Sequence, residues 1–167
     1  MQYNFEWDPA KAGENLHKHQ VSFERAPQVF LDPFARSLYD GKHSDEQARW
    51  ITLGKNRAEV SLVVVHTFRE VDLDHRAIRL ISARKATRGE RASTTLRGAS
   101  MRKEYDFSKG APGKFYRPDV RLNLPIYLDD DVAEVVQRYA RRRQVDAQAV
   151  VKEILRGNLE TLLQALL

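Results

Sequence analysis

Hydrophobic and polar residues follow two different periods along the first hundred residues, and each change of period marks a new element. Residues 3–7 alternate as a short aromatic strand. Asp8-Pro9 then predicts a helix over residues 9–17, because aspartate caps helix starts and proline suits the first helical turn. Apolar residues at helical spacing predict a second helix over residues 22–30, although Pro27 disturbs its first turn.

The period then changes to two, which is typical of β-strands. Strands are predicted at Ala35–Tyr39, Arg49–Leu53, Glu59–Arg69 and Arg76–Ala83, and a basic helix follows the last of them. The run Leu62-Val63-Val64-Val65 indicates a central strand covered on both faces. Because short polar loops join these strands, we expect an α+β domain with an antiparallel sheet and helices on one face.

The segment Met101–Asp119 has a different character, since glycines and prolines interrupt it and no helical period runs through it. It nevertheless contains four aromatic residues, Tyr105, Phe107, Phe115 and Tyr116. Plain linkers are poor in aromatic residues, so this composition predicts an arm that docks on a partner surface.

A strand and two helices are predicted after this arm. Residues 121–128 alternate strictly, Asp129 precedes a helix with an apolar stripe, and Asp146 precedes a second one. This order is typical of a ribbon-helix-helix subunit, which folds only as a homodimer and reads operator DNA with its paired strands. The side chains predicted to contact DNA are Arg121, Asn123 and Tyr127, although an ordinary exposed edge strand has the same pattern.

Composition narrows the class of protein. The formal net charge of +5 and a pI of about 9.6 favour a polyanionic partner. Cysteine is absent, so disulfides and thiolate metal sites are excluded. No apolar stretch approaches the roughly 20 residues that a membrane helix needs. We therefore expect a cytoplasmic protein without membrane contact.

Four cations near the ends of two predicted strands are the candidate catalytic group: Arg69, Arg79, Arg84 and Lys85. Arginine and lysine bind phosphate oxygens, and a ribonuclease without metal or cofactor needs little more than alignment and charge stabilisation at one phosphate. His19 is a further catalytic candidate, but its place at a helix end equally fits a cap of the last carbonyls. Convergence of the four cations on one phosphate is the expectation to test.

Three segments of the first half resemble the BrnT toxin family: Phe5-Glu6-Trp7-Asp8, Lys18-His19-Gln20-Val21-Ser22-Phe23 and Ile81-Ser82-Ala83-Arg84-Lys85-Ala86. The resemblance covers most of residues 3–91. It implies a RelE-like fold and a ribonuclease that arrests translation, with Arg69 and Arg84 in matching positions. One departure follows Glu90, where BrnT chains commonly carry a tyrosine and this chain has Arg91-Ala92-Ser93-Thr94-Thr95.

Residues 101–160 resemble the BrnA antitoxin family, beginning at an internal methionine with Met101-Arg102-Lys103-Glu104-Tyr105-Asp106-Phe107. The resemblance implies a fused type II toxin–antitoxin protein that acts on RNA, binds its own operator DNA and dimerises. The expected domains are a toxin at 1–97, a linker and arm at 98–119 and an antitoxin at 120–167. The departure after Glu90 leaves an alternative, a DNA-binding autorepressor whose toxin half is inactive.

The two halves are expected to meet through the start of the arm, either within one chain or between two. Glu104, Tyr105, Asp106 and Phe107 offer two carboxylates and two aromatic rings. We expect the carboxylates to compete with RNA for the basic site while the rings anchor in an apolar groove.

Overall fold

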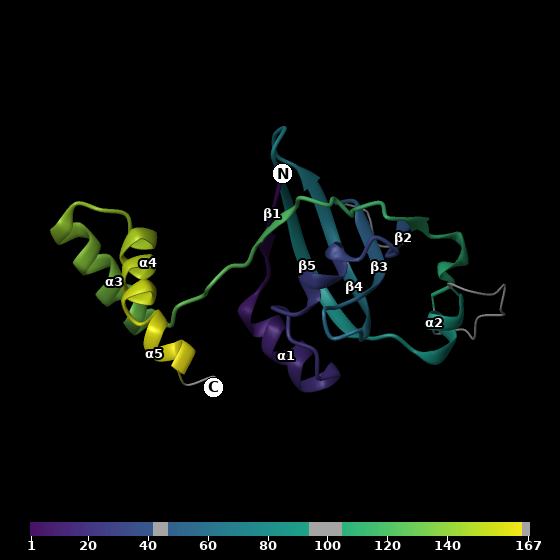
Figure 1. Ribbon diagram of the computed structural model, residues 1–167, viewed down its shortest axis with the longest axis horizontal. Helices are drawn as coiled ribbons and strands as arrows, with labels where there is room; N and C mark the ends of the chain where they lie inside the picture. Colours follow the sequence, from purple (N-terminus) through teal and green to yellow (C-terminus); the bar gives the residue numbers. More distant parts are fainter. Residues whose placement is uncertain (42–46, 94–104, 165–167) are drawn as a thin grey trace. The chain divides into compact units, whose positions relative to one another are not determined.

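The computed structural model describes residues 1–41, 47–93 and 105–164 (Figure 1). Its internal contacts divide the chain into two compact units, residues 1–125 and 126–167. The first unit is built around a β-sheet, and the second consists of helices. No helix among the described residues is both long enough and apolar enough to cross a membrane.

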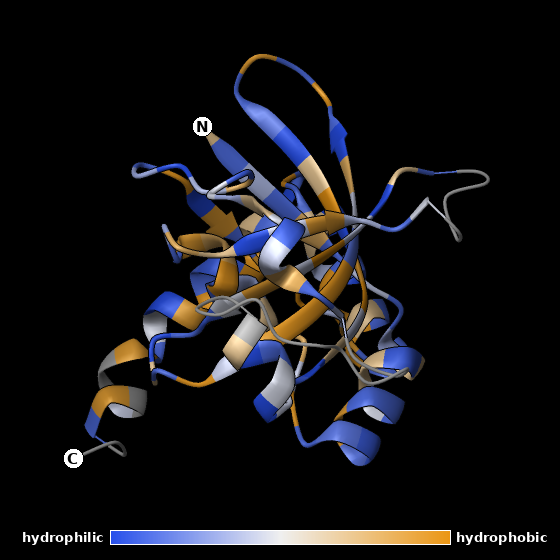
Figure 2. Cartoon of the chain, turned by 90° about the vertical axis from the view of Figure 1, so that its right-hand side faces the viewer, coloured by the Kyte–Doolittle hydropathy of each residue, from blue (hydrophilic) through white to orange (hydrophobic). Residues whose placement is uncertain are grey.

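In the described part of the first unit, seven strands form one sheet in the order β6-β2-β3-β4-β5-β1-β7. The strands are β1 (Gln2–Glu6), β2 (Arg36–Tyr39), β3 (Arg49–Lys55), β4 (Ser61–Glu70), β5 (His75–Lys85), β6 (Ala111–Pro112) and β7 (Arg121–Asn123). The four strands predicted after residue 34 are confirmed, and they pair antiparallel in chain order. The middle of the sheet is hydrophobic along its strands (Figure 2).

The expectation of a purely antiparallel sheet is wrong, because β1 runs parallel to both β5 and β7. A short turn forces two strands to pair antiparallel, but no turn joins β1 to either neighbour. The direction of β1 is therefore set by packing alone, and the sheet of this α+β fold is mixed.

Helix α1 (Pro9–His19) and the 3₁₀ helix η1 (Ala26–Leu31) cover one face of the sheet (Figure 1). Asp8 caps α1 as predicted, since its Oδ1 accepts hydrogen bonds from the backbone N–H of Ala10 at 2.9 Å and Lys11 at 3.2 Å. The α-helix predicted over residues 22–30 is wrong. Pro27 has no N–H to donate, and only the short 3₁₀ helix forms around it.

Apolar side chains fill both faces of β4, as its continuous hydrophobic run predicts. The main core lies under α1 and η1 and includes Tyr3, Phe5, Phe23, Phe30, Val64, Ile78 and Leu80. A smaller core on the opposite face contains Ile51, Leu53, Val63, Val65, Ala86 and Phe107. A residue of the predicted arm, Phe107, thus belongs to a core of the first unit.

The segment 105–123 wraps around the first unit and crosses the strands from the β2 edge to the β1 edge (Figure 1). Between these edges Phe115 enters the main core, with its ring centroid 4.6 Å from that of Phe68 and 5.1 Å from that of His66. The Tyr3 hydroxyl donates to the Phe115 carbonyl at 2.8 Å. The contacts therefore divide the chain after Pro125, whereas the sequence predicts a third domain from residue 120.

The strand predicted over residues 121–128 is much shorter in the structure. Only Arg121–Asn123 pairs, and it adds to the sheet of the first unit beside Gln2–Asn4. Pro125 cannot donate a backbone hydrogen bond, which opposes continuation of this pairing.

The second unit contains α3 (Asp130–Arg143), α4 (Ala147–Gly157) and α5 (Leu159–Gln164). Asp146 caps α4 as predicted, with Oδ1 accepting from the Gln148 N–H at 2.7 Å, whereas the Asp129 side chain makes no cap hydrogen bond to α3. Val136, Ala140 and Val150 are buried between α3 and α4. Other residues of the predicted apolar stripes remain exposed in the single chain: Val132, Val135, Tyr139, Ile154, Leu155, Leu159 and Leu163.

Candidate functional site

Strand register decides which of the candidate cations share a face. Arg84 lies opposite Val63 and Arg79 lies opposite Thr67, so both arginines are on the same face of the sheet as Arg69. Lys85 lies opposite Leu62, which packs in the main core on the other face. Three of the four candidate cations therefore share a face, and Lys85 does not.

Two further arginines occupy this face, and the sequence analysis did not select them. Arg49 lies opposite Thr67 and thus in one row with Arg79, while Arg36 lies opposite Leu53 and in one row with Arg84. We call the side of the sheet that carries Arg36, Arg49, Arg69, Arg79 and Arg84 the arginine face. Arg36 and Arg49 are identified as residues of this face only by the register of the hairpins, which could not be predicted from the sequence.

The arginines form two groups. The apolar side chains of Ile51, Leu53, Val63 and Val65 lie between and beside these groups and are called the apolar strip. Arg79 and Arg84 pair with β4 residues that are four positions apart, which corresponds to about 13 Å along a strand. Arg69 is the diagonal neighbour of Arg79. Arg49, Arg69 and Arg79 thus gather at one end, Arg36 and Arg84 lie at the other, and the expected convergence on one point is not observed.

The histidines contribute less to this face than the arginines. His19 ends α1, which covers the opposite face, and its pKa is lowered by partial burial and by the charges of Lys18 and Arg84. His66 is fully buried in the main core, where burial lowers its pKa to about 4 and its Nε2 lies 2.9 Å from the Thr52 hydroxyl. His66 is therefore a neutral, structural residue at pH 7.

Arg84 makes a bidentate ion pair with Glu90 at the edge of the arginine face. Its Nη1 and Nη2 donate to the Glu90 carboxylate at 2.8 and 2.6 Å, and the Glu90 side chain is fully buried. Glu90 also accepts from the Thr87 N–H at 3.0 Å, and the Thr87 hydroxyl accepts from the Glu90 N–H at 3.1 Å. This reciprocal pair is a capping box that starts α2 (Arg88–Ser93).

Arg84 is therefore expected to be needed for stability as well as for any role in RNA binding. Arg84→Ala leaves the Glu90 carboxylate buried without its cation, which should lower the free energy of unfolding by about 3 kcal/mol. Adding Glu90→Gln should recover part of this loss, because contacting residues are not additive. Urea denaturation of both single variants and the double variant measures the coupling, and simple additivity would contradict the ion pair.

The same pair predicts a pH dependence of stability. Burial alone would raise the pKa of Glu90, but hydrogen bonds from Arg84, Thr87 and Tyr105 hold it below the ordinary value of 4.5. A carboxyl with a depressed pKa stabilises the fold above its unfolded pKa, and this contribution disappears as the pH falls through the folded pKa. Stability should thus decrease below about pH 4.5 more steeply than in the Glu90→Gln variant.

The segment that begins at Tyr105 lies directly on the arginine face. Phe107 is 0% exposed and packs against the apolar strip between the two arginine groups. Its neighbour Tyr105 has its ring 5.8 Å from the Arg84 guanidinium, and the Tyr105 N–H donates to Glu90 at 3.2 Å. The two predicted aromatic anchors are therefore both found against this face.

The predicted carboxylates of the arm behave differently from its rings. Asp106 accepts from the Ser108 N–H at 3.0 Å and caps the short helix η3 (Phe107–Lys109). Glu104 lies outside the described residues. Among the described contacts, aromatic burial rather than charge therefore holds the segment on the sheet.

The candidate DNA-contacting residues are divided between the two units. Arg121 and Asn123 belong to β7, and the Asn123 side-chain amide donates to the Asn4 side chain at 2.9 Å. Tyr127 belongs to the second unit and is about half exposed.

Comparison with known proteins identifies the family. The family model described as the ribonuclease toxin BrnT of type II toxin–antitoxin systems matches residues 7–90. The crystal structure of the Brucella abortus ribonuclease toxin BrnT is 22% identical and covers 52% of this chain and 99% of its own, with a TM-score of 0.40. No curated protein matches the chain. With half of its length matched by the family model, the chain belongs to the BrnT family of ribonuclease toxins of type II toxin–antitoxin systems.

Proposed function

We propose that this chain is a latent, metal-independent ribonuclease whose RNA-binding surface is the arginine face, masked by segment 105–112 of the same chain. A C-terminal antitoxin-like part dimerises and binds operator DNA. The observation that carries the masking proposal is the complete burial of Phe107 on the arginine face.

The proposed catalytic group is Arg69 with Arg79, because these arginines are neighbours and both are exposed. In RNA cleavage the 2′-oxygen attacks the adjacent phosphorus, the bond from phosphorus to the 5′-oxygen breaks, and one proton leaves the first oxygen while another reaches the second. Guanidinium groups stabilise the extra negative charge of the transition state. Arg84 extends the positive surface, whereas Lys85 and His19 contribute from the other face only through long-range charge.

Masking follows from both position and chemistry. Phe107 occupies the apolar strip that a substrate has to cross between the two arginine groups. Tyr105 lies over Arg84, and the Arg36 Nη1 is 3.4 Å from the Ser108 carbonyl oxygen. The segment thus engages one arginine group and separates it from the other.

This masking should survive a break in the chain. With a protease site inserted after Ser100 and cleaved, the two pieces should elute together and remain inactive on RNA. Burial of Phe107 and Phe115 and pairing of β6 with β2 hold the second piece, and buried aromatics dominate such interfaces. Separation of the pieces during gel filtration would contradict the proposal.

The DNA-binding part of the proposal is supported by the helices of the second unit. Seven exposed apolar residues of α3, α4 and α5 need a partner, and a second copy supplies the complementary strand and helices of a ribbon-helix-helix dimer. The capped start of α4 offers backbone N–H groups to a DNA phosphate. Because Asn123 is bonded to Asn4, we propose that β7 leaves β1 when the ribbon forms.

This part predicts a stable dimer by light scattering at micromolar concentration, and a stable monomer would contradict it. Asn123→Ala should reduce discrimination between operator and unrelated DNA by about 1–3 kcal/mol, as for loss of a good base contact. Asn4→Ala is the matched control, because it removes the same hydrogen bond from the toxin side and should preserve discrimination. Unchanged discrimination in Asn123→Ala would show that the ribbon does not read the bases.

The alternative function is a DNA-binding autorepressor with an inactive toxin half. It shares the dimer and operator predictions with the leading proposal. The two differ in one result, which is RNA cleavage after segment 105–112 is displaced.

A further inference from the structure

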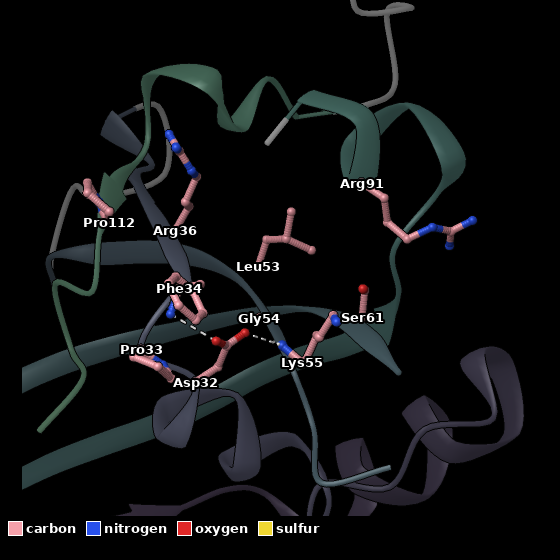
Figure 3. Close-up of a pocket in the computed structure, with 10 residues that line it drawn as sticks. All are labelled: Asp32, Pro33, Phe34, Arg36, Leu53, Gly54, Lys55, Ser61, Arg91 and Pro112. Atoms are coloured by element: carbon pink, nitrogen blue, oxygen red, sulfur yellow. Dashed lines mark hydrogen bonds between the residues drawn. The ribbon is translucent and has the colours of Figure 1, made fainter. Parts of the chain in front are cut away.

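A cavity of about 550 Å³ opens at the end of the arginine face where β3 ends and β4 begins. Figure 3 shows Phe34 and Arg36 on one side of Leu53, with Ser61 and Arg91 on the other. None of these four residues was selected from the sequence as a site residue. They come from β2, β4, α2 and the turn before β2, and only the folded sheet brings them together.

The lining of this cavity is positively charged. Among the described residues that line it, Arg36, Lys55 and Arg91 are basic and Asp32 is acidic, and the Lys55 Nζ is ion-paired with Glu59 at 2.7 Å. Both Asp32 carboxylate oxygens accept backbone hydrogen bonds, Oδ1 from the Phe34 N–H at 2.9 Å and Oδ2 from the Lys55 N–H at 2.7 Å (Figure 3). Asp32 therefore shapes the turn, and the net charge of the lining favours an anion.

Phe34 provides a second, independent signal. Its side chain is 84% exposed, although it lines the cavity and a phenylalanine usually lies inside a fold. An exposed aromatic ring beside cations is the arrangement with which proteins bind single-stranded RNA, since bases stack on rings and phosphates bind arginine and lysine.

We propose that this cavity binds one nucleotide of single-stranded RNA, with the base stacked on Phe34 and a phosphate held by Arg36. The proposal rests on the proposed function in that it takes RNA as the nucleic acid. It adds a docking site outside the apolar strip that Phe107 fills. Since the cavity is open with segment 105–112 in place, the latent chain binds RNA without cleaving it.

The cavity is also positioned to guide RNA onto the arginine face. Arg36 lies in one row with Leu53, Val63 and Arg84, so an RNA strand anchored at Phe34 runs directly toward Arg84. Pro112 of β6 borders the cavity, which places the bound nucleotide beside the masking segment.

The test is binding of a short fluorescently labelled oligouridylate to the full, latent chain, measured by fluorescence anisotropy. Phe34→Ala and Arg36→Ala should each raise the Kd about tenfold, which is the size expected for a lost stacking or phosphate contact. Two matched controls should leave the Kd unchanged. Leu73→Ala removes a 91% exposed apolar side chain from the turn after β4, and Lys11→Ala removes an exposed cation from α1.

Wild-type affinity in both cavity variants would overturn the inference. Tighter binding of the deoxyribonucleotide of the same sequence than of the oligouridylate would also overturn it, by assigning the cavity to single-stranded DNA. The result is separable from the proposed ribonuclease function. Weakened binding in these variants supports the cavity even if no form of the chain cleaves RNA, and unchanged binding refutes it even if an unmasked form is active.

Discussion

Replacing Tyr105 and Phe107 together by alanine is expected to convert the latent chain into an active ribonuclease. Replacing a buried phenylalanine by alanine costs about 3–5 kcal/mol. Because Phe107 is buried against the sheet, this cost should weaken the binding of segment 105–112 to the arginine face by that amount. At about 1.4 kcal/mol per tenfold change, the unmasked fraction and the cleavage rate should rise on the order of 100-fold or more. Cleavage of a defined RNA, followed by primer extension, measures the effect.

Phe115→Ala is the matched control for this release. It removes another buried phenylalanine from the longer segment 105–123, but one that lies outside residues 105–112 and packs on the face under α1 and η1. It should lower the free energy of unfolding without exposing the arginine face, so RNA cleavage should stay low. A folded Tyr105→Ala, Phe107→Ala variant that leaves RNA intact would favour the inactive-toxin alternative.

Within the released variant, Arg69→Ala is expected to reduce RNA cleavage by about 100- to 1000-fold, the usual result of removing one group that stabilises transition-state charge. Its side chain is exposed, so its removal should change the free energy of unfolding by no more than about 0.5 kcal/mol. The paired measurements are the single-turnover cleavage rate and the urea midpoint. Arg84→Ala should affect both, because Arg84 also neutralises the buried Glu90.

Lys85→Ala is the control for the geometry of the arginine group. Lys85 is as close to Arg84 in sequence as a residue can be, yet its register places it on the other face. Its replacement should reduce cleavage far less than that of Arg69. Equal losses would mean that the sheet register does not define the active surface.

The strands that could be predicted from the sequence are those with a strong local pattern. The run Leu62–Val65 indicates burial on both faces, and each face has its own core. The direction of β1 could not be predicted, because parallel pairing of strands far apart in the chain leaves no local signal. The apolar spacing alone predicts an α-helix over residues 22–30, whereas Pro27 indicates that this helix is disturbed, and the structure agrees with Pro27.

The site was predicted in part for a similar physical reason. Alternation correctly separates Arg69 from His66 on β4, but convergence of the cations depends on register across strands. The strand register decides whether the cations converge. It contains a shift between Val65 and His66, and it places Lys85 opposite Leu62 on the other face. Neither feature can be predicted from the pattern of a single strand. The aromatic content of residues 105–116 predicts that this segment docks on a surface. Phe107 and Phe115 are the buried anchors, and they pack on opposite faces of the sheet.

The central claim is that segment 105–112 and RNA compete for the apolar strip and Arg84 on the arginine face. The most direct measurement is RNA cleavage by the Tyr105→Ala, Phe107→Ala variant in the presence of a peptide of residues 101–112 added in trans. The proposal predicts that the natural peptide silences cleavage and that the peptide carrying Phe107→Ala does not. Undiminished cleavage at a concentration where the natural peptide is bound to the protein would contradict it.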